Sequence, residues 1–143
     1  MKREYPDSPL VGVGSIIVQN GRVVLIKRGK PPLVGEWSIP GGAMEVGETV
    51  REAVAREARE ETGLVVAVGE LLGVFDRLVR DEAGRVRYHY LLVDFLCQPV
   101  GGDLCAAGDA DECRWFAPEE LKQLPLPGDT AEVIRLGLEK APR

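Results

Sequence analysis

Hydrophobic residues along the chain fall mainly into β-branched and aromatic runs, which indicate strands separated by polar turns. The runs cover residues 11–29, 64–79, 86–100 and 113–117. The first run is divided by Asn20-Gly21, a pair typical of the type I′ turn of a tight hairpin. A Pro- and Gly-rich loop follows, with a short strand expected around Trp37 and Ser38. The pattern therefore predicts a chain dominated by strands, with a hairpin near its start.

The clearest helical segment runs from Thr49 to Thr62. Thr49 can cap its N-terminus, and Glu52 follows three residues later, which is the spacing of a capping box. Gly63 stands where helices commonly end in a left-handed residue. We therefore expect a well-delimited helix with both of its ends specified by local sequence.

Two further helices are expected near the C-terminus. Pro118 suits the first turn of a short helix over residues 118–124. A longer helix is expected over residues 128–141, with Asp129 or Thr130 as its cap. Because strands and helices are mixed rather than strictly alternating, we predict an α/β (α+β) fold. It would be a mixed sheet with helices packed on it, not a doubly wound parallel sheet.

One face of the helix over residues 49–62 changes from apolar to acidic along its length. At 100° per residue, a single stripe contains positions 50, 53, 54, 57, 60 and 61. The last three are glutamates, which repel one another at this spacing and lie near the helix C-terminus, where the helix dipole disfavours anions. A solvated acidic face, compensated by Arg56 and Arg59, is one interpretation of the stripe.

A bound cation is the other interpretation. The apolar start of the stripe should face the core, so its glutamates should point toward protein or a cleft, where charges must be paired or bound to a metal. Ligands that are all oxygen suit a hard cation such as Mg²⁺ or Mn²⁺. Gly41-Gly42, just before the helix, permits close approach of the backbone, so its carbonyl groups could join the carboxylates.

Composition is that of one globular domain. The chain has 143 residues, of which 45% are hydrophobic and 29% charged, so a single domain over residues 1–143 is expected. The absence of a long apolar run and of a signal-like N-terminus predicts a cytoplasmic protein with no membrane partner. The net charge of −5 argues against binding to a nucleic-acid polymer.

A known signature is present at fixed spacing in Gly42, Glu48, Arg56, Glu57, Glu60, Glu61, Gly63 and Leu64. These residues resemble the Nudix box, Gly-x5-Glu-x7-Arg-Glu-aliphatic-x-Glu-Glu-x-Gly-aliphatic, over residues 42–64; Ala58 stands where a bulkier aliphatic residue is usual. The order of the surrounding elements also resembles the Nudix hydrolase family, in its small MutT-like or ADP-ribose pyrophosphatase-like bacterial type. The resemblance implies a Nudix-type α/β/α sandwich built on a mixed, partly antiparallel sheet.

The resemblance implies a Mg²⁺- or Mn²⁺-dependent pyrophosphohydrolase. Water would attack phosphorus in a nucleoside diphosphate linked to another group, of the nucleoside triphosphate or ADP-ribose class. This chemistry suits the acidic stripe, because divalent metals polarise phosphoryl oxygens and lower the pKa of bound water. A non-catalytic Nudix domain that senses a nucleotide is the alternative, although the chain retains the acids of the box.

The same resemblance assigns metal ligands within the box. Glu57 and Glu61 would be the main ligands, and the Gly41 carbonyl would complete the metal shell. Glu60 would be a further ligand or would help to activate water.

Further catalytic roles follow from the resemblance. Arg56 would orient the carboxylates, and Glu48 would support them from the junction between loop and helix. Some relatives take the catalytic base from a loop far along the chain, which would here be residues 106–112. The candidate bases in that loop are Asp109, Asp111 and Glu112. Solvated loop acids remain the alternative interpretation of these three residues.

Substrate contacts are expected on both sides of the box. The basic residues that could grip phosphates are Lys27, Arg28 and Lys30, with a solvated turn as the alternative. Trp37 could stack on a base, and Asp129 and Thr130 lie where some relatives contact one. The expected partner is a small nucleotide substrate, and a homodimer is a further expectation, since small relatives often dimerise.

Overall fold

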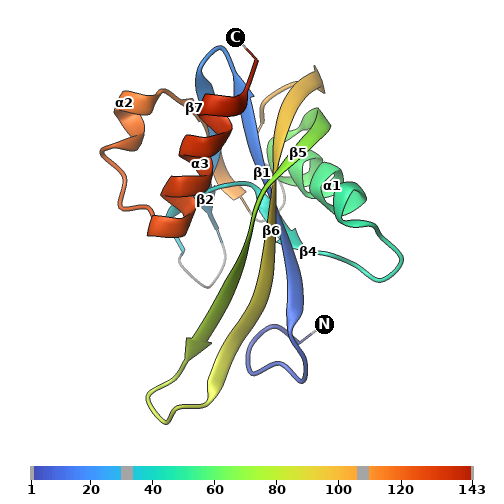
Figure 1. Ribbon diagram of the computed structural model, residues 1–143, viewed down its shortest axis with the longest axis vertical. Helices are drawn as coiled ribbons and strands as arrows, with labels where there is room; N and C mark the ends of the chain where they lie inside the picture. Colours follow the sequence, from blue (N-terminus) through green and yellow to red (C-terminus); the bar gives the residue numbers. More distant parts are fainter. Residues whose placement is uncertain (1, 30–33, 106–109, 143) are drawn as a thin grey trace.

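The computed structural model describes residues 2–29, 34–105 and 110–142, with the side chains of residues 110 and 111 excepted. Within these ranges the strands are β1 (Leu10–Gln19), β2 (Arg22–Arg28), β3 (Trp37–Ser38), β4 (Gly41–Ala43), β5 (Leu64–Arg80), β6 (Val86–Gly102) and β7 (Ala110–Phe116). The helices are α1 (Val50–Thr62), α2 (Pro118–Leu121) and α3 (Gly128–Lys140). Figure 1 shows the strands between α1 and α3, with the hairpin of β5 and β6 extending beyond both helices.

The strands form one mixed sheet in the order β3-β2-β1-β6-β5. Strand β1 also pairs with β4, and β2 also pairs with β7. The pairing of β1 with β6 is parallel, from Leu10 opposite Tyr90 to Ile17 opposite Cys97. The other strand pairs are antiparallel. The predicted mixed, partly antiparallel sheet is therefore confirmed.

Local signals in the sequence fix the hairpin and the main helix as predicted. Asn20 and Gly21 both have positive φ, 53° and 75°, as the type I′ turn between β1 and β2 requires. At the start of α1, the Thr49 hydroxyl accepts from the backbone N–H of Glu52, whose carboxylate accepts from the N–H of Thr49. At its end, Gly63 has a φ of 77°. Both predicted caps of α1 are therefore confirmed.

The sheet carries a hydrophobic core on each of its faces. Alternate residues of β1 point to opposite faces, so Val13 and Ile17 pack in one core and Ile16 and Val18 in the other. Helix α1 covers the first core with Ala53, Val54 and Ala58. Helix α3 covers the second with Val133 and Ile134. This arrangement confirms the α/β/α sandwich (Figure 1).

Several boundaries differ from the sequence prediction, among them the end of α2, at Leu121 rather than at residue 124, the start of β7 and the N-cap of α3. Residues 110–112 were expected in a loop, but β7 begins at Ala110, because pairing with β2 overrides the weak strand propensity of acidic residues. Helix α3 was expected to have Asp129 or Thr130 as its cap, but it begins at Gly128 with Pro127 as the capping residue and no side-chain cap. The Asp129 carboxylate instead bonds to Arg77 on β5.

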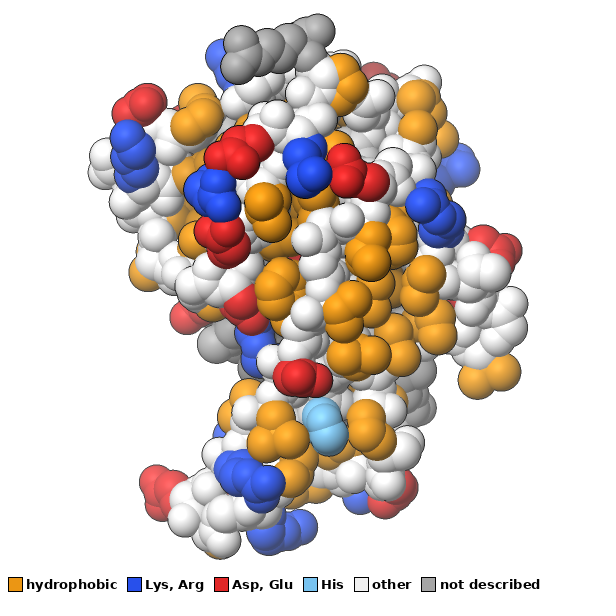
Figure 2. Space-filling view, viewed as in Figure 1, with side chains coloured by type: hydrophobic (Ala, Val, Ile, Leu, Met, Phe, Trp, Pro, Cys, Tyr) orange, Lys and Arg blue, Asp and Glu red, His pale blue; other side chains and the backbone are white. Residues whose placement is uncertain are grey.

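The outer face of the β5–β6 hairpin exposes hydrophobic side chains. Leu71, Val74, Leu78 and Leu91 are each at least 40% exposed, and Figure 2 shows hydrophobic side chains gathered over these strands. Among the described residues, no helix is both long enough and apolar enough to cross a membrane.

Candidate active site

The acidic half of α1 is organised around the Arg56 guanidinium. Its Nε and Nη2 atoms donate to the two oxygens of Glu48 at 2.6 and 2.9 Å, which is a bidentate pair. Its Nη1 donates to Glu57 at 2.8 Å and to Glu60 at 3.2 Å. Nη2 also donates to the Ala43 carbonyl at 3.0 Å, which ties the helix to β4. One guanidinium therefore contacts three carboxylates and one carbonyl. The orienting role that the family resemblance implies for Arg56 stays a prediction.

These contacts shift the acidity of the groups involved. The hydrogen bond from Arg56 lowers the pKa of Glu48, and the bond to Glu48 raises the pKa of Arg56. Glu57 shows the opposite shift, because burial raises its pKa by more than Arg56 lowers it. Holding Glu57 as an anion therefore costs free energy, and a nearby cation would offset this cost.

Glu57 lies directly against the Gly42 backbone. A Cβ atom on residue 42 would stand 2.6 Å from the Glu57 carboxyl group, so glycine is required for this approach. Glu61, one turn later, is 5% exposed, and its Oε1 accepts from the Gly41 N–H at 2.6 Å. The inward side of α1 thus presents two carboxylates to the Gly41-Gly42 segment of β4. Glu60 is different, because its side chain is 55% exposed on the outer side of the cluster.

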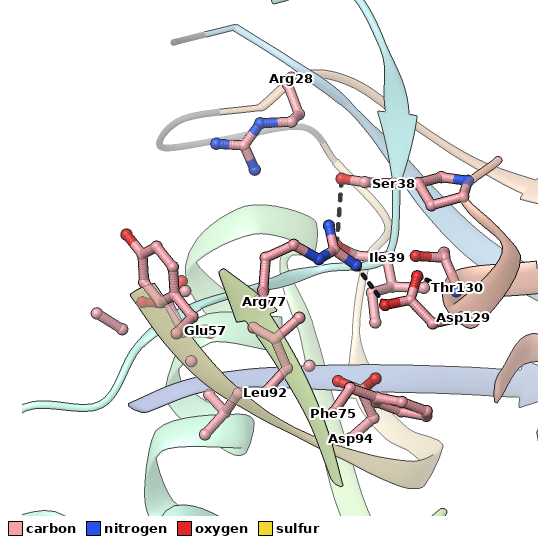
Figure 3. Close-up of a pocket in the computed structure, with 18 of the residues that line it drawn as sticks. Arg28, Ser38, Ile39, Glu57, Phe75, Arg77, Leu92, Asp94, Asp129 and Thr130 are labelled. Atoms are coloured by element: carbon pink, nitrogen blue, oxygen red, sulfur yellow. Dashed lines mark hydrogen bonds and ion pairs between the residues drawn. The ribbon is translucent and has the colours of Figure 1, made fainter. Parts of the chain in front are cut away.

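Both inward carboxylates border one pocket of about 380 Å³. A volume of this size is within the range of small-molecule sites. Glu57, Glu61, Gly41 and Gly42 form one end of the pocket. The rest is lined by strands of the sheet and by the start of α3, with Phe75, Arg77, Leu92, Asp94, Asp129 and Thr130 among the lining residues (Figure 3).

The structure brings several of the predicted substrate residues to this pocket. Arg28, Trp37, Asp129 and Thr130 all line it. Trp37 also packs edge-to-face on Phe116, with ring centroids 4.9 Å apart, so it belongs partly to the core. Arg28 points toward the pocket in Figure 3.

Other predicted residues lie elsewhere or outside the described part of the chain. Lys27 pairs with Glu112 across β2 and β7 at 3.3 Å, and neither residue is among those that line the pocket. Lys30 and Asp109 lie outside the described residues, and the side chain of Asp111 is not among those described. The roles predicted for these five residues stay predictions.

Among the pocket residues that sequence reasoning missed are Phe75, Arg77 and Asp94. Asp94 had a usable signal, because an aspartate within the otherwise apolar run Leu91–Cys97 is unusual in a strand. Arg77 and Phe75 had none, because their place depends on how β5 and β6 pair.

Comparison with known proteins decides the family. The family model described as "NUDIX domain" matches residues 8–137. The chain belongs to the Nudix family. Its Nudix box is the segment that supplies Gly42, Glu57 and Glu61 to the pocket, with Arg56 bonded to Glu57.

Three Nudix relatives illustrate the similarity. An "ADP-ribose pyrophosphatase" from Methanocaldococcus jannaschii is 41% identical over 128 residues, which cover 89% of this chain and 72% of the relative. A "MutT-like protein" from Streptomyces ambofaciens is 34% identical over 85% of this chain and 73% of its own. The crystal structure of a MutT Nudix hydrolase from Burkholderia pseudomallei superposes with a TM-score of 0.73 at 34% identity, covering 95% of this chain and all of that one. The chain is thus a Nudix hydrolase, an enzyme that acts on diphosphate bonds.

Proposed function

We propose that this Nudix hydrolase is a Mg²⁺-dependent pyrophosphohydrolase that cleaves a nucleoside diphosphate linked to another group by attack of water on phosphorus. The substrate would belong to the nucleoside triphosphate or ADP-ribose class. One observation carries the proposal: Glu57 and Glu61 project from α1 into a single pocket beside the Gly41-Gly42 segment. The relative named an ADP-ribose pyrophosphatase supports the ADP-ribose class, and a relative from Mycobacterium tuberculosis named "Putative 8-oxo-dGTP diphosphatase 2" supports the triphosphate class.

The donor set at this end of the pocket fits a hard divalent cation. Glu57, Glu61 and the Gly41 carbonyl offer oxygen ligands, which Mg²⁺ and Mn²⁺ prefer. Among the described residues, no group of three or more acidic, histidine or cysteine side chains is already gathered around one point. A site with two carboxylates suits Mg²⁺, which usually retains waters and takes further ligands from substrate phosphates. The raised pKa of Glu57 supports the same assignment, because a cation favours its charged form.

When bound, such a cation would neutralise the diphosphate and lower the pKa of a coordinated water. The chain's own residues would position the carboxylates that hold the cation. Arg56 holds Glu57 from one side, and the Gly41 N–H holds Glu61. Glu48 fixes Arg56 by the bidentate pair, so the carboxylates are positioned before substrate arrives.

The proton of the attacking water requires a carboxylate within hydrogen-bond reach. Glu61 lines the pocket, and Glu60 lies at the outer edge of the cluster, so these two are our candidates for the base. Glu112 is a weaker candidate because its carboxylate pairs with Lys27. Arg28, Trp37, Asp129 and Thr130 are proposed to contact the nucleotide, since they line the remainder of the pocket.

A panel of nucleoside triphosphates and ADP-ribose, incubated with and without Mg²⁺ and analysed for products, tests the proposal. We expect hydrolysis that requires the cation and yields a nucleoside monophosphate. Glu57→Gln and Glu61→Gln should each lower kcat/KM by about 100-fold or more, because each removes a negative charge proposed to hold the cation while the amide oxygen can keep the neighbouring hydrogen bond. Glu82→Gln, in the exposed β5–β6 turn, is the matched control and should be neutral. Unchanged turnover in both box variants, with folding retained, would refute the assignment.

A further inference from the structure

Asp94 is a buried carboxylate that the proposed chemistry does not use. It lies in the middle of β6, it is 6% exposed, and it lines the pocket at the end away from Glu57 (Figure 3). Among the described residues no hydrogen bond reaches its carboxylate, and its oxygens are open to the pocket rather than sealed in the core, since no fully buried side-chain oxygen of the described chain lacks a partner. Its oxygens therefore face the pocket without a donor from the described chain.

The strands on both sides of Asp94 make room for its side chain. Gly14 of β1 and Gly73 of β5 are its neighbours across the sheet. A Cβ atom on residue 14 would stand 2.3 Å from the Asp94 Oδ1, so any larger residue would displace the carboxylate. The Phe75 ring covers the place of a side chain on Gly73, because a Cβ there would stand 2.6 Å from the ring. Asp94 therefore opens onto a hollow that has an aromatic ring at its side.

The charged side chains that face Asp94 are those of Asp129 and Arg77, which bond to each other. The Asp94 carboxylate is therefore available to a ligand. Asp129, from the start of α3, is bonded to Arg77 of β5 at 2.6 Å. Burial raises the pKa of Asp94 to about 6, with a further contribution from Asp129 and an opposing one from Arg77. The group is thus an anion in neutral buffer, and a desolvated anion without a donor costs free energy that an N–H donor from a ligand would recover.

We infer that Asp94 selects the base of the substrate: its carboxylate accepts an N–H from the exocyclic amino group of a purine whose ring lies beside Phe75. In place of the adenine 6-amino group, hypoxanthine would set a carbonyl oxygen against the carboxylate, which is repulsive; in place of the guanine 2-amino group, it offers no donor. The enzyme should therefore prefer adenine or guanine nucleotides over their hypoxanthine counterparts. The kinetic assay of this inference rests on the proposed function. The inference adds a specificity-determining residue to that function.

The test compares substrates that differ at the exocyclic amino group: GTP and ITP differ in the 2-amino group alone, and ATP and ITP differ by a 6-amino against a 6-oxo group. The triphosphate series is ATP, GTP and ITP, because hypoxanthine lacks both the adenine 6-amino and the guanine 2-amino group. ADP-ribose and its hypoxanthine analogue form a second pair. A preference for ATP over ITP identifies adenine as the source of the donor, and a preference for GTP over ITP identifies guanine. A ribose hydroxyl bound to Asp94 instead would give no preference, because all of these compounds share the ribose.

For the wild-type enzyme we expect kcat/KM to favour one amino-purine over hypoxanthine by about 10- to 100-fold, as a site built to accept an amino group should. Asp94→Asn should reduce that ratio to within about threefold, since an amide can accept from an amino group or donate to an oxo group. Asp76→Asn is the matched control, because Asp76 is exposed on β5 and does not line the pocket. It should leave the ratio unchanged.

Two results would overturn the inference: equal kcat/KM values in the wild type, or the same preference in wild type and Asp94→Asn. Thermal melting checks that Asp94→Asn, which is nearly isosteric, remains folded; if it does not, the wild-type ratio still decides. If no nucleotide is hydrolysed, the proposed function fails but the inference does not, because calorimetric binding of ATP, GTP and ITP tests the same preference.

Discussion

Helices α1 and α3 each carry an arginine between glutamates, yet the two clusters differ in their surroundings. Arg56 of α1 is 21% exposed and bonds to Glu48, Glu57 and Glu60 beside the pocket. Arg135 of α3 is 53% exposed and bonds to Glu132 and Glu139 on the outer surface. Similar residue types at similar spacing therefore give a partly buried site in one helix and a solvated surface cluster in the other.

The difference shows what distinguishes a functional acidic face from a solvated one. The stripe of α1 continues from the core residues Ala53 and Val54, so its glutamates are carried inward to the Gly41-Gly42 segment. The cluster of α3 lies on the side of the helix opposite Val133 and Ile134. The position of the apolar residues, rather than the number of acids, decides which cluster reaches the pocket.

The largest effect is expected for Arg56→Gln. It leaves Glu48 and Glu57 without their shared partner, so kcat/KM should fall by about 100-fold and the free energy of unfolding by about 2–3 kcal/mol. Metal-supplemented kinetics and denaturant unfolding measure the two effects. Arg59→Gln, on the exposed side of the same helix, is the control. An Arg56→Gln enzyme with turnover within threefold of wild type would show that the network does not organise the site.

An intermediate effect, on stability, is expected for Asp94→Asn. The pKa of Asp94 is raised from 3.8 to about 6 in the folded chain, so Asp94 stabilises the fold below about pH 4 and this contribution is lost as pH rises through 6. The asparagine variant cannot ionise, so at pH 8 it should be more stable than wild type by up to about 3 kcal/mol. At pH 4 the difference should vanish. Denaturant unfolding at both pH values provides the measurement, and a variant that is less stable at pH 8 would contradict the described environment of Asp94.

The smallest effect is expected for Arg135→Gln. Exposed ion pairs on a helix contribute little, so the variant should shift Tm by no more than about 2 °C and should leave kcat/KM unchanged. Calorimetry and the same kinetic assay test this. A loss of activity comparable to that of Arg56→Gln would remove the distinction between the two helices.

The sequence predicted those parts of the fold that depend on neighbouring residues. Thr49, Glu52 and Gly63 delimit α1, and Asn20-Gly21 sets the first hairpin, because caps and tight turns are specified within a few positions. The mixed sheet and the α/β/α sandwich followed from the order of elements and from resemblance to the family. The start of β7 was missed because pairing with β2, far away in sequence, decides it.

The contrast between local signals and long-range strand pairing also separates the part of the site that could be predicted from the part that could not. The box end of the pocket could be predicted, because Glu57 and Glu61 lie on one helix at fixed spacing. The other end could not, because Asp94 and Arg77 reach the pocket through the register of β6 with β1 and β5. Local sequence does not contain that register.

We propose that water attacks phosphorus at the Glu57–Glu61 end of the pocket with the help of a divalent cation. Hydrolysis of ADP-ribose and of the preferred nucleoside triphosphate in ¹⁸O-labelled water, with and without Mg²⁺, tests it most directly. We predict that phosphate-ester or diphosphate products form in the presence of the cation and carry ¹⁸O on a phosphoryl group. Label on a sugar carbon, or equal product formation in the presence of a chelator, would contradict the claim.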